Sequence, residues 1–513
     1  MTLARLLDRA ALRRPEATAV VDGVERLTYA ELSTRAHALG RGLAALGVAR
    51  GDRVLITLKN RIEHVLAYWA LQAIGGVPVP VNFRLAGGEL RYVLGDSEAR
   101  VLLFEPATAP AVLEATERWR GRLVFVGDSA PSPGTLSFGE LMAAGTAAPS
   151  RDFPVDERDL SLILYTSGTT GRPKGVPRTH RNHHAGALAH ALQCAYAWGE
   201  RTLGVMPLYH TMGIHSLTSV ASVNGCFVCQ ADWSAASALA LVEAERITAL
   251  YLIPTLYHDL VHAPDFRPAR VASVRKLAYA GAPMLAALTE ACVAAFRPDV
   301  FVNHYGSTEI YTFSVFPDVH TKPGCAGRAG LHSTLRVVTA SSERRVGADE
   351  TVAPGEKGEI IASLDSDEAF AGYWKRPDAD ARALRDGWYF TGDMGYLDED
   401  GDLFVSGRVD DMIISGGENI HPVEVEEVLA RHALVRDAAV IGAPDEKWGE
   451  RVVAFVVARE PHLTGEMLDR HCLASPDLAN FKRPRQFVFV EAIPKTSSGK
   501  ILRRVLRDGT AWR

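Results

Sequence analysis

Short apolar runs alternate with amphipathic helical patterns through most of the chain. The runs at 52–58, 77–82, 100–105 and 122–128 are rich in Val, Leu, Ile and Phe and predict buried strands. Residues 61–76, which end in two glycines, predict a helix between the first two strands. Strands separated by helices favour βαβ units, in which helices cover both faces of a parallel sheet. The pattern therefore predicts an α/β fold with stacked sheets.

The pattern changes near residues 407–421. Before this point, residues 387–407 alternate in polarity around an Asp-Gly pair and predict a β-hairpin. After it, a helix from about 422 and two apolar runs predict a compact α+β unit. We therefore predict a large N-terminal domain over residues 1–407 and a small, mobile C-terminal domain over 408–513.

Composition and charge narrow the class of protein. A length of 513 residues exceeds what one core supports. The net charge of −5 argues against a protein that coats nucleic acid or a membrane surface. Cys226 and Cys229 form a CxxC pair, but they lie in an apolar run without a second pair, which favours packed thiols in a reducing compartment. We expect a cytoplasmic monomer or homodimer that binds neither nucleic acid nor membrane.

The strongest chemical signal is YTSGTTGRPKG at residues 165–175. Four hydroxyl side chains, three glycines and Lys174 can surround a polyanion with donors and one cation. The order of residues does not fit the Walker pattern, because Pro173 precedes the lysine and Gly175 follows it. The stretch therefore predicts a phosphate-binding loop of another class of nucleotide enzyme.

Four further motifs follow this loop in the chain. They are YGSTE (305–309), YFTGD (389–393), GRVDDMIISGGENIHPVEVE (407–426) and PKTSSGK (494–500). Together the five motifs resemble the signature set of the adenylate-forming superfamily, which comprises acyl-CoA synthetases, peptide-synthetase adenylation domains and beetle luciferases. Their residues are most similar to those of 4-halobenzoate-CoA ligases. The resemblance implies a two-step reaction, in which ATP converts a carboxylate into an acyl-AMP and coenzyme A then takes the acyl group.

The resemblance also implies where ATP is bound. Asp393 would accept hydrogen bonds from the ribose hydroxyls, Tyr305 would contact adenine, and Thr308 would contact the α-phosphate. Glu309 would bind Mg²⁺. The full set of implied ATP-binding residues is Thr166, Ser167, Gly168, Thr169, Thr170, Lys174, Gly281, Ala282, Tyr305, Thr308, Asp393 and Arg408.

The small domain carries the implied catalytic lysine. Lys500 lies in a Ser/Thr/Gly loop and would contact the carboxylate and the α-phosphate during adenylation only. The small domain would then rotate about a hinge at 408–411, matched by Asp410, and present its other face. Asp410 and Asp411 are alternatively a simple solvated turn.

By the same resemblance, coenzyme A binds mainly to the small domain. The matching residues are Arg84, Gly416, Gly417, Trp448, Phe481, Arg483 and Arg485. Their types suit a ligand that carries an adenine ring and several phosphates.

The pocket for the carboxylic acid is expected behind His210, which is also a candidate catalytic residue at the pocket mouth. Its implied walls are Thr211, Met212, Tyr251, His304, Gly306, Ile310, Tyr311 and Thr312. These bulky groups predict a short pocket for a small aromatic or cyclic acid, and the polar atoms of Tyr251, His304 and Thr312 suggest a ring that bears a heteroatom.

Several alternatives stay open at this stage. A medium- or long-chain fatty acyl-CoA synthetase, or a stand-alone adenylation enzyme that uses a carrier protein, fits the same motifs. An amino-acid-activating domain is disfavoured, because no acidic residue closely follows His210. A catalytically dead relative is disfavoured because Lys500 and Glu309 are present. His180 and His184 are either a metal-binding pair or residues of a helix end. His304 is either a pocket wall or a structural group. The basic C-terminal tail is either a phosphate site or a nucleic-acid patch.

Overall fold

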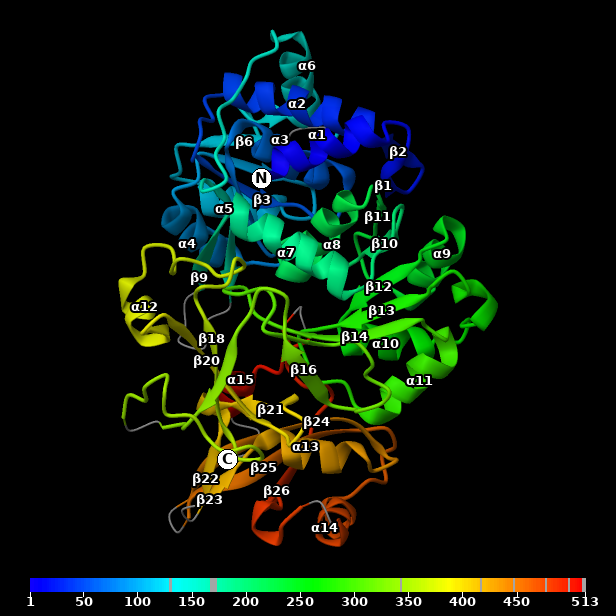
Figure 1. Ribbon diagram of the computed structural model, residues 1–513, viewed down its shortest axis with the longest axis vertical. Helices are drawn as coiled ribbons and strands as arrows, with labels where there is room; N and C mark the ends of the chain where they lie inside the picture. The colour runs from blue at the N-terminus through cyan, green and yellow to red at the C-terminus, as the bar shows by residue number, and fades with distance from the viewer. Residues whose placement is uncertain are drawn as a thin grey trace.

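The computed structural model describes residues 1–128, 132–166, 173–341, 344–415, 418–445, 448–475, 478–496 and 499–509. Side chains of residues 410, 414, 418 and 419 are outside this description. The chain forms a large mixed α/β domain and a smaller α+β domain, which lie at opposite ends of the long axis (Figure 1). The predicted fold class is confirmed.

The largest sheet runs through the middle of the large domain. Its central strands β14, β13, β12, β10 and β11 are parallel neighbours, and antiparallel strands extend it on both sides. In spatial order the strands are β17 (Leu335–Val338), β18 (Gly358–Ser363), β20 (Trp388–Leu397), β21 (Leu403–Arg408), β16 (Cys325–Ala329), β15 (Ser314–Phe316), β14 (Val300–Tyr305), β13 (Lys276–Tyr279), β12 (Ala249–Leu252), β10 (Arg201–Gly204), β11 (Cys226–Cys229), β1 (Thr18–Asp22) and β2 (Glu25–Thr28), with β19 (Leu384–Arg385) beside β20.

A second sheet is the parallel one that the first apolar runs predict. Each of its pairings is parallel, in the order β4 (Val77–Pro80), β3 (Arg53–Thr57), β5 (Val101–Phe104), β6 (Arg122–Phe125) and β7 (Leu136–Ser137). The helix between the first two strands, α3 (Ile62–Ile74), is buried on nearly all sides, with Trp69 1% exposed. This explains why its sequence is apolar rather than amphipathic.

The remaining elements cover these sheets or link them. The hairpin β8 (Leu160–Thr166) and β9 (Lys174–Thr179) flanks the predicted phosphate loop. The helices of the large domain are α1 (Leu3–Arg13), α2 (Tyr29–Ala45), α4 (Gly87–Ser97), α5 (Ala109–Thr116), α6 (Phe138–Ala147), α7 (His180–Gln193), α8 (Thr211–Ser222), α9 (Ala235–Glu245), α10 (Pro254–Val261), α11 (Ala286–Phe296) and α12 (Pro377–Ala383). Among the helices that the structure describes, none has the length and apolar character needed to span a membrane.

The small domain has its own sheet and core. Its strands are β23 (Glu418–Ile420), β22 (Ile413–Ser415), β25 (Gly449–Ala458), β24 (Val435–Asp445) and β26 (Gln486–Phe489), and its helices are α13 (Pro422–Ala430), α14 (Gly465–Ala474) and α15 (Arg503–Asp508). The chain leaves the large sheet at Arg408 and enters the small one at Ile413, through a short 3-10 turn at Val409–Asp411.

Candidate active site

The candidate site begins at the carboxyl ends of the central parallel strands. Gly281 and Ala282 follow β13, and Tyr305 ends the adjacent strand β14. In open α/β sheets ligands bind at this edge, because loops from neighbouring parallel strands leave the sheet side by side there. Gly281 has a φ of 85°, a left-handed conformation that suits glycine.

Asp393 is the centre of a hydrogen-bonded group on the hairpin of β20 and β21. The strand register pairs it with Arg408, whose Nη1 donates to Asp393 Oδ1 at 2.6 Å. The Tyr305 hydroxyl donates to Asp393 Oδ2 at 2.7 Å. Each carboxylate oxygen keeps a second lone pair, so both oxygens can still accept a hydroxyl proton from a ligand. Three of the predicted ATP-binding residues thus form one rigid group.

Glu309 lies beside this group and is 7% exposed. The Tyr373 hydroxyl donates to Glu309 Oε1 at 2.7 Å, and the Lys174 ammonium lies 4.2 Å from the centre of the Tyr373 ring. Desolvation lowers the pKa of Lys174, whereas the charge of Glu309 opposes that shift. A buried carboxylate with one oxygen committed to a hydroxyl and the other available has the chemistry of a Mg²⁺ ligand.

Sequence reasoning missed Tyr373 and its neighbour Trp374. Trp374 joins the hairpin beside the phosphate loop to α4. Its backbone N–H donates to the Gly175 carbonyl on β9 at 2.8 Å, and its indole N–H donates to the Asp96 carbonyl on α4 at 3.0 Å. Both aromatic residues follow Gly372 in a loop almost 200 positions beyond the hairpin. The local sequence gives no signal of this contact, because it forms only between distant segments.

Lys500 reaches the same region from the small domain. Its loop is a tight turn in which Gly499 N–H donates to the Thr496 carbonyl at 2.9 Å and Lys500 N–H donates to Thr496 Oγ1 at 3.1 Å. Gly499 packs on the large domain so closely that a Cβ atom there would lie 3.1 Å from Ile253 Cδ1. The structure therefore brings the loop against the start of α10.

Burial and nearby charges shift the pKa of Lys500. Although exposed by surface area, its side chain is crowded by protein, and desolvation lowers the pKa of Lys500. The charge of Arg408 lowers it further, whereas Asp393 and Glu309 raise it. The lysine therefore shares one electrostatic environment with the residues of both preceding groups.

The predicted walls of the acid pocket form a buried polar network. Tyr251 Oη lies 3.4 Å from His304 Nδ1, and His304 Nε2 lies 3.1 Å from Thr312 Oγ1. Tyr311 Oη donates to Tyr251 Oη at 3.3 Å. These polar atoms already have partners within the protein, so a heteroatom on the acid would have to compete with them. His304 is thus a buried, hydrogen-bonded residue, and its place in an acid pocket stays a prediction.

The network extends to residues that the sequence did not single out as pocket walls. His190 Nδ1 lies 2.9 Å from Tyr311 Oη, and the His215 ring stacks on Tyr311 with centroids 3.5 Å apart. Desolvation lowers the pKa of His304 to about 4, and burial holds the pKa values of His190 and His215 well below the ordinary range. The walls are therefore uncharged.

His210 and Gly306 are two further residues of the predicted pocket. His210 precedes α8 as its N-terminal cap residue, and desolvation lowers its pKa to about 4, so the imidazole is neutral. Gly306 is exposed, and a Cβ atom there would lie 1.8 Å from the Tyr311 carbonyl oxygen. Thr211, Met212 and Ile310 pack nearby on α8 and after β14.

The predicted CoA residues are not brought together in this arrangement. Arg84 precedes α4 in the large domain, whereas Phe481, Arg483 and Arg485 precede β26 at the far end of the molecule (Figure 1). Trp448 is 50% exposed and Phe481 43% exposed. Ser167, Gly168, Thr169, Thr170, Gly416 and Gly417 lie outside the described residues, as does the Asp410 side chain.

The metal alternatives raised by the sequence have structural explanations. His180 Nδ1 accepts a hydrogen bond from the Leu3 N–H at 3.2 Å, and Cys226 and Cys229 are buried thiols on β11, as predicted. Among the described residues, the acidic group with metal-like spacing is Asp398, Asp400 and Asp402, and the Lys322 ammonium pairs with all three carboxylates.

Basic residues of the C-terminal tail are engaged in ion pairs inside the small domain. Arg503 pairs with Glu426 at 2.6 Å, Lys495 pairs with Asp437 at 2.6 Å, and Arg483 pairs with Asp469. These pairs account for much of the positive charge that suggested a nucleic-acid patch.

Comparison with known proteins agrees with this geometry. The chain matches the AMP-binding enzyme family over residues 7–374 and the C-terminal domain of AMP-binding enzymes over residues 424–500. It is 38% identical to a feruloyl-CoA synthase from Amycolatopsis over 507 residues, covering 97% of each chain. It is 34% identical to a 4-chlorobenzoate–CoA ligase from Arthrobacter over 517 residues, covering 99% of this chain and 95% of the relative.

A solved structure extends the similarity to three dimensions. The benzoate CoA ligase of Burkholderia xenovorans LB400 superposes with a TM-score of 0.89 at 28% identity, covering 99% of this chain and 100% of the other. The chain therefore belongs to the family of AMP-binding enzymes. The predicted family and the predicted class, an AMP-forming acid–thiol ligase, are confirmed at that level.

Proposed function

We propose that this protein is an ATP-dependent carboxylate–CoA ligase that forms an acyl-AMP and then an acyl-CoA thioester from a small aromatic or cyclic acid. The observation that carries the proposal is the seating of Gly499 against Ile253, which brings the Lys500 loop to the large domain, where the charges of Asp393 and Glu309 act on the lysine. One cation from the small domain thus meets a nucleotide-type site built by the large domain.

In the first step a carboxylate oxygen of the acid attacks the α-phosphorus of ATP, and pyrophosphate leaves. Asp393, held by Tyr305 and Arg408, binds the ribose hydroxyls and orients the nucleotide. Lys500 stabilises the charge that builds on the α-phosphate and on the attacking carboxylate. Thr308 and Lys174 supply further donors, and the loop at 166–174 holds the terminal phosphates.

Glu309 is the proposed ligand for Mg²⁺, which would neutralise phosphate charge when bound. Tyr373 fixes the carboxylate by donating to Oε1, and Oε2 would be the oxygen that holds the ion. Such partners of a metal ligand typically contribute 10- to 100-fold to metal affinity or activity.

In the second step the CoA thiol attacks the acyl carbonyl, its proton is released, and AMP leaves. The small domain is proposed to rotate about residues 408–411, so that Phe481, Arg483, Arg485 and Trp448 meet the CoA nucleotide together with Arg84. Gly416 and Gly417 would line the path of the pantetheine arm. Arg84 and the small-domain residues lie apart in the present arrangement of the domains. This agrees with a CoA step that requires a second arrangement.

The acid is proposed to be a small flat ring acid. The walls contributed by Tyr251, His304 and Tyr311 are buried and bulky, and their histidines are uncharged. An uncharged aromatic pocket favours a neutral ring over a second charged group, because a buried charge without a partner is costly. The similarity to a feruloyl-CoA synthase and to a 4-chlorobenzoate–CoA ligase, both named for aromatic acyl groups, supports this class.

The test is CoA-dependent AMP release across a panel of acids. The panel holds benzoate, its hydroxy and amino forms, furoate, cyclohexanecarboxylate and fatty acids of increasing length. A sharp preference among ring acids is expected. Best activity on chains of eight or more carbons would favour a fatty acyl-CoA synthetase instead, and AMP release that requires a carrier protein rather than CoA would favour a stand-alone adenylation enzyme.

A further inference from the structure

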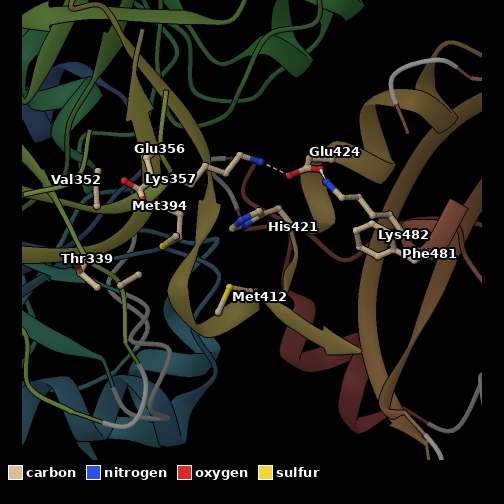
Figure 2. Close-up of a pocket in the computed structure, with 11 residues that line it drawn as sticks. Thr339, Val352, Glu356, Lys357, Met394, Met412, His421, Glu424, Phe481 and Lys482 are labelled. Atoms are coloured by element: carbon tan, nitrogen blue, oxygen red, sulfur yellow. Dashed lines mark hydrogen bonds and ion pairs between the residues drawn. The ribbon is translucent and has the colours of Figure 1, made fainter. Parts of the chain in front are cut away.

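A cross-domain ion pair lies outside the site described so far. Lys357 immediately precedes β18 in the large domain, and its ammonium contacts Glu424 Oε1 on α13 of the small domain. The other oxygen of Glu424 contacts the ammonium of Lys482. Figure 2 shows the two lysines approaching the carboxylate from opposite sides. Apart from the Arg408–Asp393 pair at the domain boundary, the Lys357–Glu424 pair is the cross-domain ion pair found among the described side chains.

The pair is partly shielded from solvent. The side chains of Lys357, Glu424 and Lys482 are 33%, 20% and 21% exposed. Desolvation raises the pKa of Glu424, but the two lysines outweigh it and leave the pKa below its ordinary value. The carboxylate therefore stays charged at neutral pH and gains more from its partners than a freely solvated surface pair does.

A cavity of about 430 Å³ lies between the domains beside the ion pair, lined by Met394 of the large domain and by Met412, His421 and Phe481 on the small-domain side. Dispersion contacts need close approach, so walls that face a cavity contribute little attraction. The ion pair thus joins the domains next to a gap in their packing.

We infer that Lys357 and Glu424 are positioning residues for adenylation, which hold the small domain in the arrangement that seats Lys500 against the large domain. This inference rests on the proposed function. The pair joins the same two domains that the Gly499–Ile253 contact joins. Loss of the pair would lower the fraction of molecules in this arrangement. The rate of the first half-reaction would then fall in proportion to that fraction.

The first test separates the half-reactions. Lys357→Ala is expected to lower ATP–pyrophosphate exchange about 3- to 10-fold, as befits a partly buried pair, and to leave thioester formation from supplied acyl-AMP and CoA unchanged or faster. Lys357→Arg should retain exchange. Lys357→Glu should lower exchange further, and the double variant Lys357→Glu with Glu424→Lys should recover only part of it, because Lys482 would then lie beside a second ammonium group.

A matched control uses an ion pair within the large domain. Lys375 pairs with Glu98 at 2.6 Å, both side chains being well exposed, so Lys375→Ala should leave both half-reactions unchanged. An equal loss of both half-reactions in Lys357→Ala would overturn the inference, because a structural defect spares neither. Unchanged exchange in Lys357→Glu would overturn it as well.

A distance measurement tests the pair independently of catalysis. Val24, in the large domain, and Leu473, on α14, are exposed, whereas all six native cysteines are buried. Spin labels at Val24→Cys and Leu473→Cys should report a broader distance distribution when Lys357→Ala is added in the presence of ATP. An unchanged distribution would refute the role of the pair. If the native chain adenylates no acid, the proposed function fails while this measurement still decides on the ion pair.

Discussion

Replacement of Lys500 by alanine tests the central contact of the proposed site. The variant removes an ammonium that stands on a loop packed against Ile253 and whose pKa responds to the charges of Asp393 and Glu309. Loss of one preorganised donor to a developing oxyanion costs about 3–4 kcal/mol in other enzymes, or roughly 10²–10³ in rate. We therefore expect adenylation to fall by roughly 10²–10³.

The assay is ATP–pyrophosphate exchange with the best ring acid, beside thioester formation from supplied acyl-AMP. The second reaction should change less than about twofold, because the proposed role of Lys500 is confined to the first step. Lys495→Ala is the matched control, since this lysine belongs to the same segment but pairs with Asp437 inside the small domain at 2.6 Å. Equal losses in both half-reactions would refute the role of Lys500.

The pH dependence of adenylation gives an independent check of the same contact. Desolvation and Arg408 lower the pKa of Lys500, so the ammonium loses its proton at a lower pH than an ordinary lysine does. Adenylation should therefore decline on the alkaline side as pH rises through that lowered pKa. Lys500→Arg should shift this decline to higher pH, since arginine remains charged. An alkaline limb that is identical in both proteins would contradict this reasoning.

Three further outcomes follow from buried contacts. Tyr373→Phe removes the donor to Glu309 and should raise the Mg²⁺ concentration needed for half-maximal adenylation about 10-fold, whereas an unchanged Mg²⁺ titration would contradict the contact. Gly306→Ala should lower both activity and the melting temperature, because its Cβ would meet a backbone carbonyl oxygen at 1.8 Å; a fully stable variant would exclude that clash. Burial raises the pKa of Glu368 to about 7, so the folded chain holds this proton more tightly than the unfolded chain. The free energy of unfolding should therefore fall by roughly 3 kcal/mol at most as pH rises from about 5 to 8. Glu368→Gln can still accept the hydrogen bond from the Thr312 N–H. This variant should show a weaker pH dependence of stability in denaturant titrations at several pH values.

The sequence by itself determined the class of fold and most of the nucleotide site. Apolar runs spaced by helices gave the parallel sheet of β3, β4, β5 and β6, because burial on both faces leaves a continuous apolar strand. The motifs around Asp393 and Glu309 were visible because each functional residue lies within a few positions of its glycines, hydroxyls and turns. Local chemistry of this kind is encoded locally.

The tertiary structure alone decided the contacts that join distant segments. Tyr373 meets Glu309, Trp374 binds Gly175, and Lys357 reaches Glu424 across 67 positions of chain. The tertiary structure also decided that the polar atoms of the predicted acid-pocket walls form hydrogen bonds with one another. The identities of these residues in the sequence did not indicate this. The physical reason is that burial, partner choice and charge shifts depend on which surfaces are brought together. A residue type specifies what it can bind, but the fold specifies which partners lie within reach.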